Sequence, residues 1–300
     1  MESENVFKKA CLIQLTTSNW QGTRMLDQGI MEKLGKSSEW LRGRKYLINP
    51  ELLGPIHTST HQARNLVQQY SLPFPITSIY LIPKESLSLV DERLTLQKEK
   101  FHQKVEEFIG IYDQAREEAK EFLGNLFNET DYPVDIRSKF RFEWRFLALE
   151  LPRKGSILSP EIYEREKQKF ESMMQEAREL AAVALREELA EIVNHLVGKL
   201  NGNGSQPRTL KGSMFNKLHE FLDDLSTRNI FNDEKLAELA EEARAAVNGV
   251  SPYGLNYNES MKGRIKASMD ALKVSIDEAI EDLPKRKIRL APAVSASATA

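Results

Sequence analysis

The longest periodic pattern of apolar residues spans residues 87–126. Its apolar positions recur in steps of three and four, and a single step of seven crosses a polar gap at Gln97 and Lys98. No proline interrupts residues 85–128. The spacing predicts one helix of about 41 residues, on the order of 60 Å long, which ends at Asn128. The seam consists of Leu87, Val90, Leu94, Phe101, Val105, Phe108, Tyr112, Ala115, Ala119, Phe122 and Leu126.

A second long helix is predicted from Ser159 to Asn201. Ser159 is a suitable N-cap, the following proline fits the first helical position, and Glu161 complements the positive end of the helix. The apolar seam begins at Tyr163 and shifts by one residue at Leu185, which indicates a local phase change. Because the two helices are nearly equal in length, we predict that they form a long antiparallel, coiled-coil-like pair.

Residues 140–146 alternate strictly between aromatic and charged side chains. Such alternation is typical of a half-buried strand, here extending towards Pro152. Two further apolar runs, Cys11–Leu15 and Ile79–Ile82, are candidate strands. The strand at 140–146 either pairs with these two runs in a small sheet or lies alone at one end of the helical pair, and the pattern leaves both alternatives open.

The remaining segments predict a mainly α (α+β) protein with a small β element and a C-terminal helical region. Shorter helices are predicted over 24–34 and 60–70 near the N-terminus, and over 210–225, 233–247 and 257–283 near the C-terminus. We therefore divide the chain into an N-terminal α+β region (1–84), the long helical pair with a β insertion around 137–152 (85–204), a C-terminal helical region (205–284), and a basic cluster with a disordered tail (285–300).

Composition narrows the class of protein. The chain has 300 residues with 42 Lys and Arg against 44 Asp and Glu, a net charge of −2, which excludes binding to nucleic acid by bulk charge but not by a local patch. Cys11 is the only cysteine, so the chain has neither an intramolecular disulfide nor a metal cage built from cysteines. No apolar run reaches the roughly 18 residues of a membrane helix and no signal peptide is visible, so we expect a cytoplasmic protein without a membrane partner.

Two stretches combine basic and aromatic residues, and they are the candidate binding residues. The first contains Trp40, Arg42, Arg44 and Lys45, and lies in a region, residues 1–84, with ten basic and six acidic residues. The second contains Arg141 and Arg145 beside the aromatic residues of the predicted strand. Arginines next to exposed aromatics could hold a single-stranded nucleic acid through phosphate contacts and stacking. The simpler interpretation places the aromatics in the core and the arginines in solvent.

The sequence carries no local signature of catalysis. Gly35-Lys36-Ser37 resembles the end of a phosphate-binding loop, but isoleucine stands where that loop needs its first glycine. His57 and His61 have the spacing of helical metal ligands, yet Pro55 is expected to leave His57 outside the helix and no further ligands follow closely. We therefore predict no catalytic residue, metal or cofactor and favour a non-enzymatic protein. A dispersed active site that includes the two histidines is the remaining enzymatic alternative.

Four segments carry a resemblance to a known family: Asn19–Arg24, Ser38–Tyr46, Phe140–Phe146 and Asn248–Gly254. Over residues 8–290 the chain resembles an uncharacterised bacterial domain-of-unknown-function family of phages and mobile elements. That resemblance implies genes beside a MoxR-type AAA+ ATPase and a von Willebrand A-domain protein, and an accessory role as adaptor, scaffold or client. It assigns no catalytic residues.

The favoured function is that of a non-enzymatic cytoplasmic interaction or adaptor protein of a phage or mobile element, working with a AAA+ ATPase. The alternative is a single-stranded nucleic-acid-binding protein that uses the basic-aromatic stretches. Self-association is expected if a helical seam is not covered within one chain.

Overall fold

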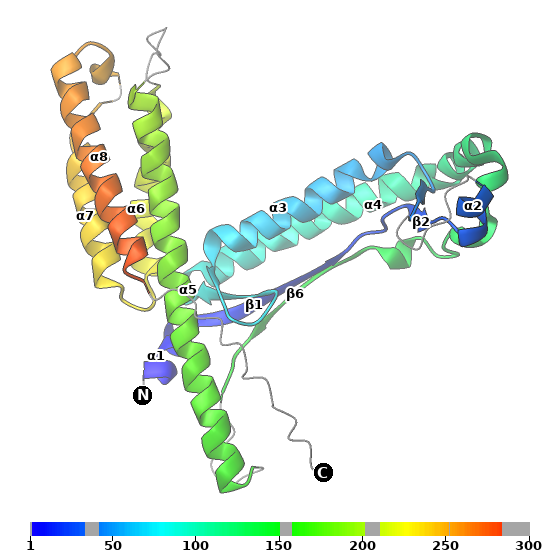
Figure 1. The fold of residues 1–300 in the computed structure, drawn as a ribbon, viewed down its shortest axis with the longest axis horizontal. Coiled ribbons are helices and arrows are strands. Elements are labelled where there is room, and N and C mark those ends of the chain that lie inside the picture. Colours follow the sequence, from blue (N-terminus) through cyan, green and yellow to red (C-terminus); the bar gives the residue numbers. More distant parts are fainter. Residues whose placement is uncertain (1, 34–41, 151–157, 202–210, 252, 284–300) are drawn as a thin grey trace, which may run out of the picture. The chain divides into compact units, whose positions relative to one another are not determined.

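The structure is a computed structural model that describes residues 2–33, 42–150, 158–201, 211–251 and 253–283. The chain forms two compact units, Met1–Glu171 and Ser172–Ala300, and the boundary falls within a long helix (Figure 1). The described residues are mainly α-helical with a small antiparallel sheet, as predicted. In the same residues, no helix is both long and apolar enough to cross a membrane. The four-part division of the sequence stays a prediction.

The first unit is built around a four-stranded antiparallel sheet with the order β4-β5-β1-β6. β1 pairs with β5 on one side and with β6 on the other, so the predicted strand at 140–146 joins the two other predicted strands in one sheet. A separate two-stranded sheet is formed by β2 and β3. The elements of this unit are α1 (Glu2–Lys9), β1 (Ala10–Ser18), β2 (Thr23–Met25), α2 (Gln28–Lys33), β3 (Arg44–Tyr46), α3 (Gly54–Tyr70), β4 (Leu72–Pro73), β5 (Ile79–Pro83), α4 (Leu87–Leu123) and β6 (Arg141–Leu147).

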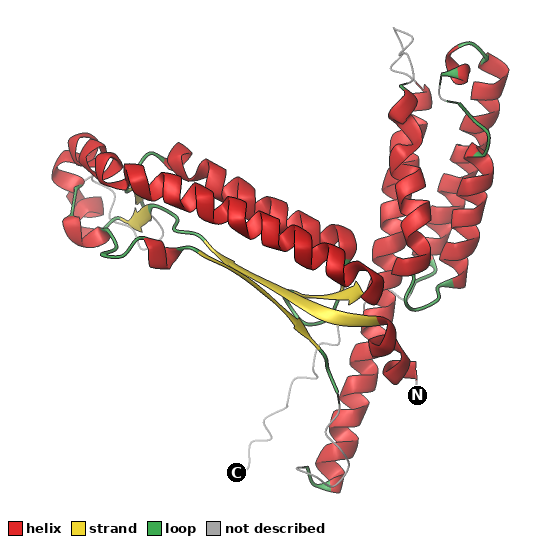
Figure 2. Cartoon of the chain, turned by 180° about the vertical axis from the view of Figure 1, so that it is seen from behind, coloured by secondary structure: helices red, strands yellow, loops and turns green. Residues whose placement is uncertain are grey.

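Helices α3 and α4 lie side by side along one face of the sheet (Figure 2). Every seam position predicted from Val90 to Ala119 is buried, and Phe101 of α4 packs against Phe142 of β6 with ring centroids 5.4 Å apart. The polar gap in the seam also has a partner, because the Gln97 side chain donates hydrogen bonds to the Ser59 carbonyl and hydroxyl oxygens of α3. The seam is therefore covered from Val90 to Ala119, whereas Phe122, near the end of α4, is 91% exposed.

The second unit is helical. It contains α5 (Pro160–Asn201) from residue 172 onward, together with α6 (Asn216–Arg228), α7 (Glu234–Val247) and α8 (Glu259–Glu281). As predicted, α5 begins after Ser159, whose hydroxyl accepts from the backbone N–H of Ile162 at 3.4 Å, and ends at Asn201. Each helix contributes an apolar stripe to the core, for example Leu189, Leu218, Leu239 and Met269.

The predicted antiparallel pairing of the two long helices is not confirmed. The seam of α4 is covered by α3 and the sheet, whereas the buried residues of α5 from Met174 onward belong to the helical unit. A heptad seam shows that one face of a helix is covered, but it does not identify the covering element. The equal lengths of the two helices made a mutual pair the simplest inference.

Two local predictions near the N-terminus were wrong. The helix predicted over 24–34 is instead β2 followed by the short α2, because Thr23–Met25 pairs with β3. The helix predicted to begin at Thr60 begins at Gly54, so His57 lies inside it rather than before it. Pro55 occupies the first turn of α3, where the missing N–H has no intrahelical acceptor to lose.

Candidate functional site

The first basic-aromatic stretch is partly used by the fold itself. Trp40 lies outside the described residues, while Arg42 and Arg44 are exposed. The side chain of Lys45 is only 8% exposed, because its ammonium group contacts the Asp131 carboxylate at 2.6 Å and donates to the Leu126 carbonyl oxygen at 2.5 Å. Lys45 therefore ties β3 to the segment after α4. A role in nucleic-acid binding stays a prediction for Trp40, Arg42 and Arg44.

The second stretch separates its aromatic and basic side chains onto two faces. Phe142 is buried on the face covered by the helices, and the Trp144 indole on the same face donates to the Asp91 carboxylate at 2.8 Å. Arg141 and Arg145 are exposed and alternate with these aromatics along β6. Because neighbouring strand residues point to opposite faces, the arginines of β6 have no aromatic residue of the same strand beside them for stacking.

Arg141 and Glu143 form an exposed ion pair on this open face of β6. The guanidinium Nη2 donates to the Glu143 carboxylate at 2.5 Å. This hydrogen bond is the main cause of a lowered pKa at Glu143. The open face thus carries a positive charge at Arg141, a negative charge at Glu143 and a positive charge at Arg145.

The two candidate histidines lie on α3. His57 is half-buried and its Nε2 atom has no hydrogen-bond partner, whereas His61 is exposed. Within the residues that the structure describes, no three His, Cys, Asp or Glu side chains lie close enough together to hold a metal ion. Among the described residues, His57 and His61 therefore have no third side chain with which to hold a metal ion.

Cys11 lies half-buried on β1, and burial raises the pKa of its thiol. Since the thiolate is the reactive form, we expect iodoacetamide at pH 8 to alkylate Cys11 several-fold more slowly in the native protein than in urea. Mass spectrometry measures both rates without ambiguity, because the chain has one cysteine. Equal rates in the two states would show that the thiol is not protected by the sheet.

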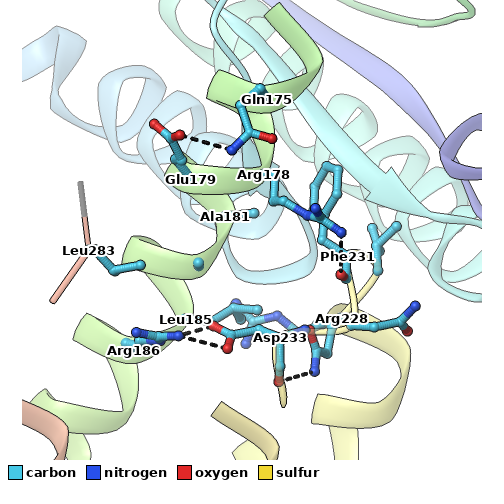
Figure 3. Close-up of a pocket in the computed structure, with 14 residues that line it drawn as sticks. Gln175, Arg178, Glu179, Ala181, Leu185, Arg186, Arg228, Phe231, Asp233 and Leu283 are labelled. Carbon is cyan, nitrogen blue, oxygen red and sulfur yellow. Dashed lines mark hydrogen bonds and ion pairs between the residues drawn. The ribbon is translucent and has the colours of Figure 1, made fainter. Parts of the chain in front are cut away.

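A cavity with a volume of about 260 Å³ lies in the helical unit (Figure 3). It is lined by α5, by the turn between α6 and α7, and by a residue beyond α8. Its lining is mainly apolar. It includes the apolar side chains of Ala181, Ala182, Leu185, Ile230 and Leu283 and the polar side chains of Gln175, Arg178 and Asn232.

Two buried arginines hold the helices around this cavity. Arg186 of α5 donates through Nε and Nη2 to both carboxylate oxygens of Asp233, at 2.9 and 2.7 Å, and Figure 3 shows the two groups facing each other. Its Nη1 donates to the Ala279 carbonyl oxygen of α8 at 2.5 Å. Arg228 at the end of α6 makes a second two-pronged pair with Glu188 of α5, at 3.0 and 2.6 Å.

Besides pairing with Arg186, the Asp233 carboxylate caps a helix. Asp233 is the N-cap of α7, and its carboxylate accepts from the Leu236 N–H at 3.1 Å. The Asn229 side chain also brackets its backbone, accepting from the Asp233 N–H at 2.7 Å and donating to its carbonyl oxygen at 3.0 Å. One carboxylate therefore fixes both the start of α7 and its attachment to α5.

The two arginine–carboxylate pairs determine which groups of the cavity are left to contact a ligand. The charges of Arg186 and Arg228 are matched by carboxylates of the protein, so these two groups act as structural anchors. What remains is a mainly apolar hollow with a few polar side chains in its lining, somewhat smaller than a usual small-molecule site. Such a hollow matches the pockets that receive anchor side chains at protein interfaces.

Sequence reasoning missed this cavity because its lining comes from segments more than 40 residues apart. One signal was present: Arg186 falls among apolar positions that continue the stripe of α5, between Leu185 and Leu189. A charged residue on a buried stripe needs a buried partner, but the periodicity does not say which residue supplies it.

The fold and the cavity together define a mainly α protein with one helix-covered sheet unit and one helical unit that carries a pocket. A family model described as "Protein of unknown function (DUF3150)" matches residues 7–201, and the chain belongs to this family. The match includes the sheet unit from residue 7 onward and α5 but ends before α6, so Arg228 and Asp233 lie outside it. Neither the curated proteins nor the solved structures include a match to the chain.

Proposed function

We propose that the chain is a non-enzymatic, cytoplasmic adaptor protein whose helical unit receives an apolar side chain of a partner protein in the cavity between α5 and the α6–α7 turn. The observation that carries the proposal is the form of this cavity, whose lining is mainly apolar and whose two arginines are each paired with a carboxylate of the protein. Binding pockets of this kind contribute most when their shape exists before the partner arrives.

The sheet unit supports the same proposal with exposed apolar side chains. Phe122 is 91% exposed and Val134 is fully exposed, and both lie in the segments around the end of α4. Tyr46 of β3 is 59% exposed and neighbours this region, since Lys45 bonds to Leu126 and Asp131. Contiguous apolar patches are typical of contact surfaces, and we propose that these side chains contribute to one. An adaptor needs two surfaces, and each unit offers one.

The partners that we propose are a MoxR-type AAA+ ATPase and a von Willebrand A-domain protein of the same phage or mobile element. To test this, the tagged chain is used to isolate its partners from its native cell after nuclease treatment, with ATP or a non-hydrolysable analogue. We expect an identified ATPase or A-domain protein to be recovered by the wild-type chain. Ala182→Phe, which fills the cavity, is expected to reduce that recovery at least tenfold.

Ala245→Phe is the matched control, because it makes the same change at an exposed position of α7. It should recover the partner as well as the wild type does. Circular dichroism of both variants establishes that the helices are intact. Equal recovery by Ala182→Phe and Ala245→Phe would contradict a role for the cavity, and recovery of nucleic acid alone would contradict the adaptor.

The alternative function, single-stranded nucleic-acid binding, is supported by the exposure of Arg42, Arg44, Arg141 and Arg145. It requires salt-dependent retention of a labelled oligonucleotide, because phosphate contacts release counterions. Loss of retention in Arg42→Ala/Arg44→Ala, with normal retention in a variant of the exposed Arg264, would favour it. Absence of binding at low salt eliminates it.

A further inference from the structure

The two edges of the four-stranded sheet are built differently. One edge is β4, which has two residues and includes Pro73, a residue without a backbone N–H. The other edge is β6, which has seven residues and no proline, and which pairs with β1 over its whole length without a bulge. Short strands, prolines and bulges protect many edges, and β6 has none of these; the charged side chains along it are the one edge-protecting feature that it carries.

β6 therefore presents an unpaired edge to a further strand. Among the described residues its one strand neighbour is β1 (Figure 1). An edge of this length can be extended by main-chain hydrogen bonds to another strand, and the side chains then decide which strand fits. In β6 the deciding side chains are the exposed Arg141, Glu143 and Arg145.

These charges discriminate between the registers in which two copies of β6 can pair antiparallel about a two-fold axis. An axis at Glu143 places Glu143 opposite itself and Arg141 opposite Arg145, and an axis at Arg145 places that arginine opposite itself. Both registers oppose like charges, which is destabilising. An axis at Phe142 pairs Arg141 with Glu143 but places Lys139 opposite Arg145 and leaves the end of the strand unpaired.

An axis at Trp144 avoids each of these conflicts. It places Glu143 of one copy opposite Arg145 of the other, twice by symmetry. It also aligns all seven residues, because Arg141 falls opposite Leu147, and it brings Phe142 opposite the half-exposed Phe146. Opposite charges and aromatic residues directly across a strand pair are both stabilising.

We propose that a second copy of this chain pairs with β6 in antiparallel orientation about a two-fold axis at Trp144, and that the two four-stranded sheets join into one continuous sheet. A two-fold pair is also the commonest form of homo-oligomer and closes on itself. The proposal is independent of the cavity in the helical unit.

The first test is a charge exchange followed by sedimentation analysis from low micromolar concentration upward. The wild type is expected to have twice the mass of the chain. Glu143→Arg and Arg145→Glu are each expected to weaken the dimer at least tenfold, because each places like charges opposite. The double variant E143R/R145E restores opposite charges and is expected to regain the dimer. Both side chains are exposed, so the fold of the monomer should be unchanged by circular dichroism.

The second test determines the register by disulfide formation in a Cys11→Ser background. Glu143→Cys and Arg145→Cys chains are expected to crosslink when mixed under mild oxidation, and to crosslink little when each is alone. Directly opposite residues lie close enough for a disulfide, whereas diagonal ones do not.

Three results would overturn the proposal. These are a monomer at all concentrations, a dimer that neither single charge variant weakens, or crosslinking of one cysteine variant with itself. Crosslinking of Glu143→Cys alone would place the axis at residue 143. The cavity variant Ala182→Phe should keep the mass of the dimer, so the failure of one proposal is distinguishable from the failure of the other.

Discussion

Replacing Arg186 by alanine is expected to lower the free energy of unfolding of the helical unit by about 3–5 kcal/mol, the usual cost of removing one partner from a buried ion pair. The Arg186 side chain is 9% exposed and the Asp233 side chain 12% exposed. Loss of the guanidinium leaves the carboxylate buried without its main partner and frees the Ala279 carbonyl oxygen. It also loosens the start of α7, because the same carboxylate caps that helix.

The measurement can separate the two units because all three tryptophans, Trp20, Trp40 and Trp144, lie in residues 1–171. In Arg186→Ala, urea unfolding followed by far-ultraviolet circular dichroism should show an earlier transition. The transition followed by tryptophan fluorescence should stay in place. An earlier fluorescence transition would contradict a role confined to the helical unit.

Lys235→Ala provides the matched control for the ion pair. Lys235 and Glu238 are 3.2 Å apart, but their side chains are 51% and 65% exposed. Removing such a pair is expected to cost at most about 1 kcal/mol, since water screens both charges. If Lys235→Ala destabilised the protein as much as Arg186→Ala, burial would not explain the contribution of the Arg186–Asp233 pair to the free energy of unfolding.

The sequence predicts a helix or strand well where burial repeats along one segment. The seam of α4 from Val90 to Ala119 and the alternation of β6 both follow from side chains that meet one covering layer at regular intervals. The cap at Ser159 was equally predictable, because a short polar side chain bonds to a backbone N–H two or three residues away. In each of these cases the interacting pattern lies within one segment, so the sequence of that segment is enough to predict it.

Partners that are distant in sequence leave no comparable signal. Lys45 and Asp131 are 86 residues apart, and neither residue type indicates that the other is its partner. The same holds for Arg186 and Asp233, and hence for the cavity whose shape they maintain. The covering element of α4 belongs to this class too, because α3 and α5 both offer an apolar stripe and the seam accepts either.

Phe101→Ala tests which layer covers α4, and it is expected to destabilise the sheet unit by about 3–5 kcal/mol through the cavity left behind. Phe101 is fully buried and packs against Phe142 of β6. The control is Phe122→Ala on the same helix, where the ring is 91% exposed and the expected change is within about 0.5 kcal/mol. Both changes remove the same atoms from the same seam, so only burial distinguishes them.

Tryptophan fluorescence during urea unfolding measures the two variants, since Trp144 follows Phe142 on β6 and reports on the layer that Phe101 contacts. We expect the fluorescence transition of Phe101→Ala to move to lower urea while that of Phe122→Ala stays with the wild type. If Phe101→Ala instead left the fluorescence transition in place and shifted only the transition followed by far-ultraviolet circular dichroism, the seam of α4 would be packing in the helical unit. Such a result would support the antiparallel pair with α5.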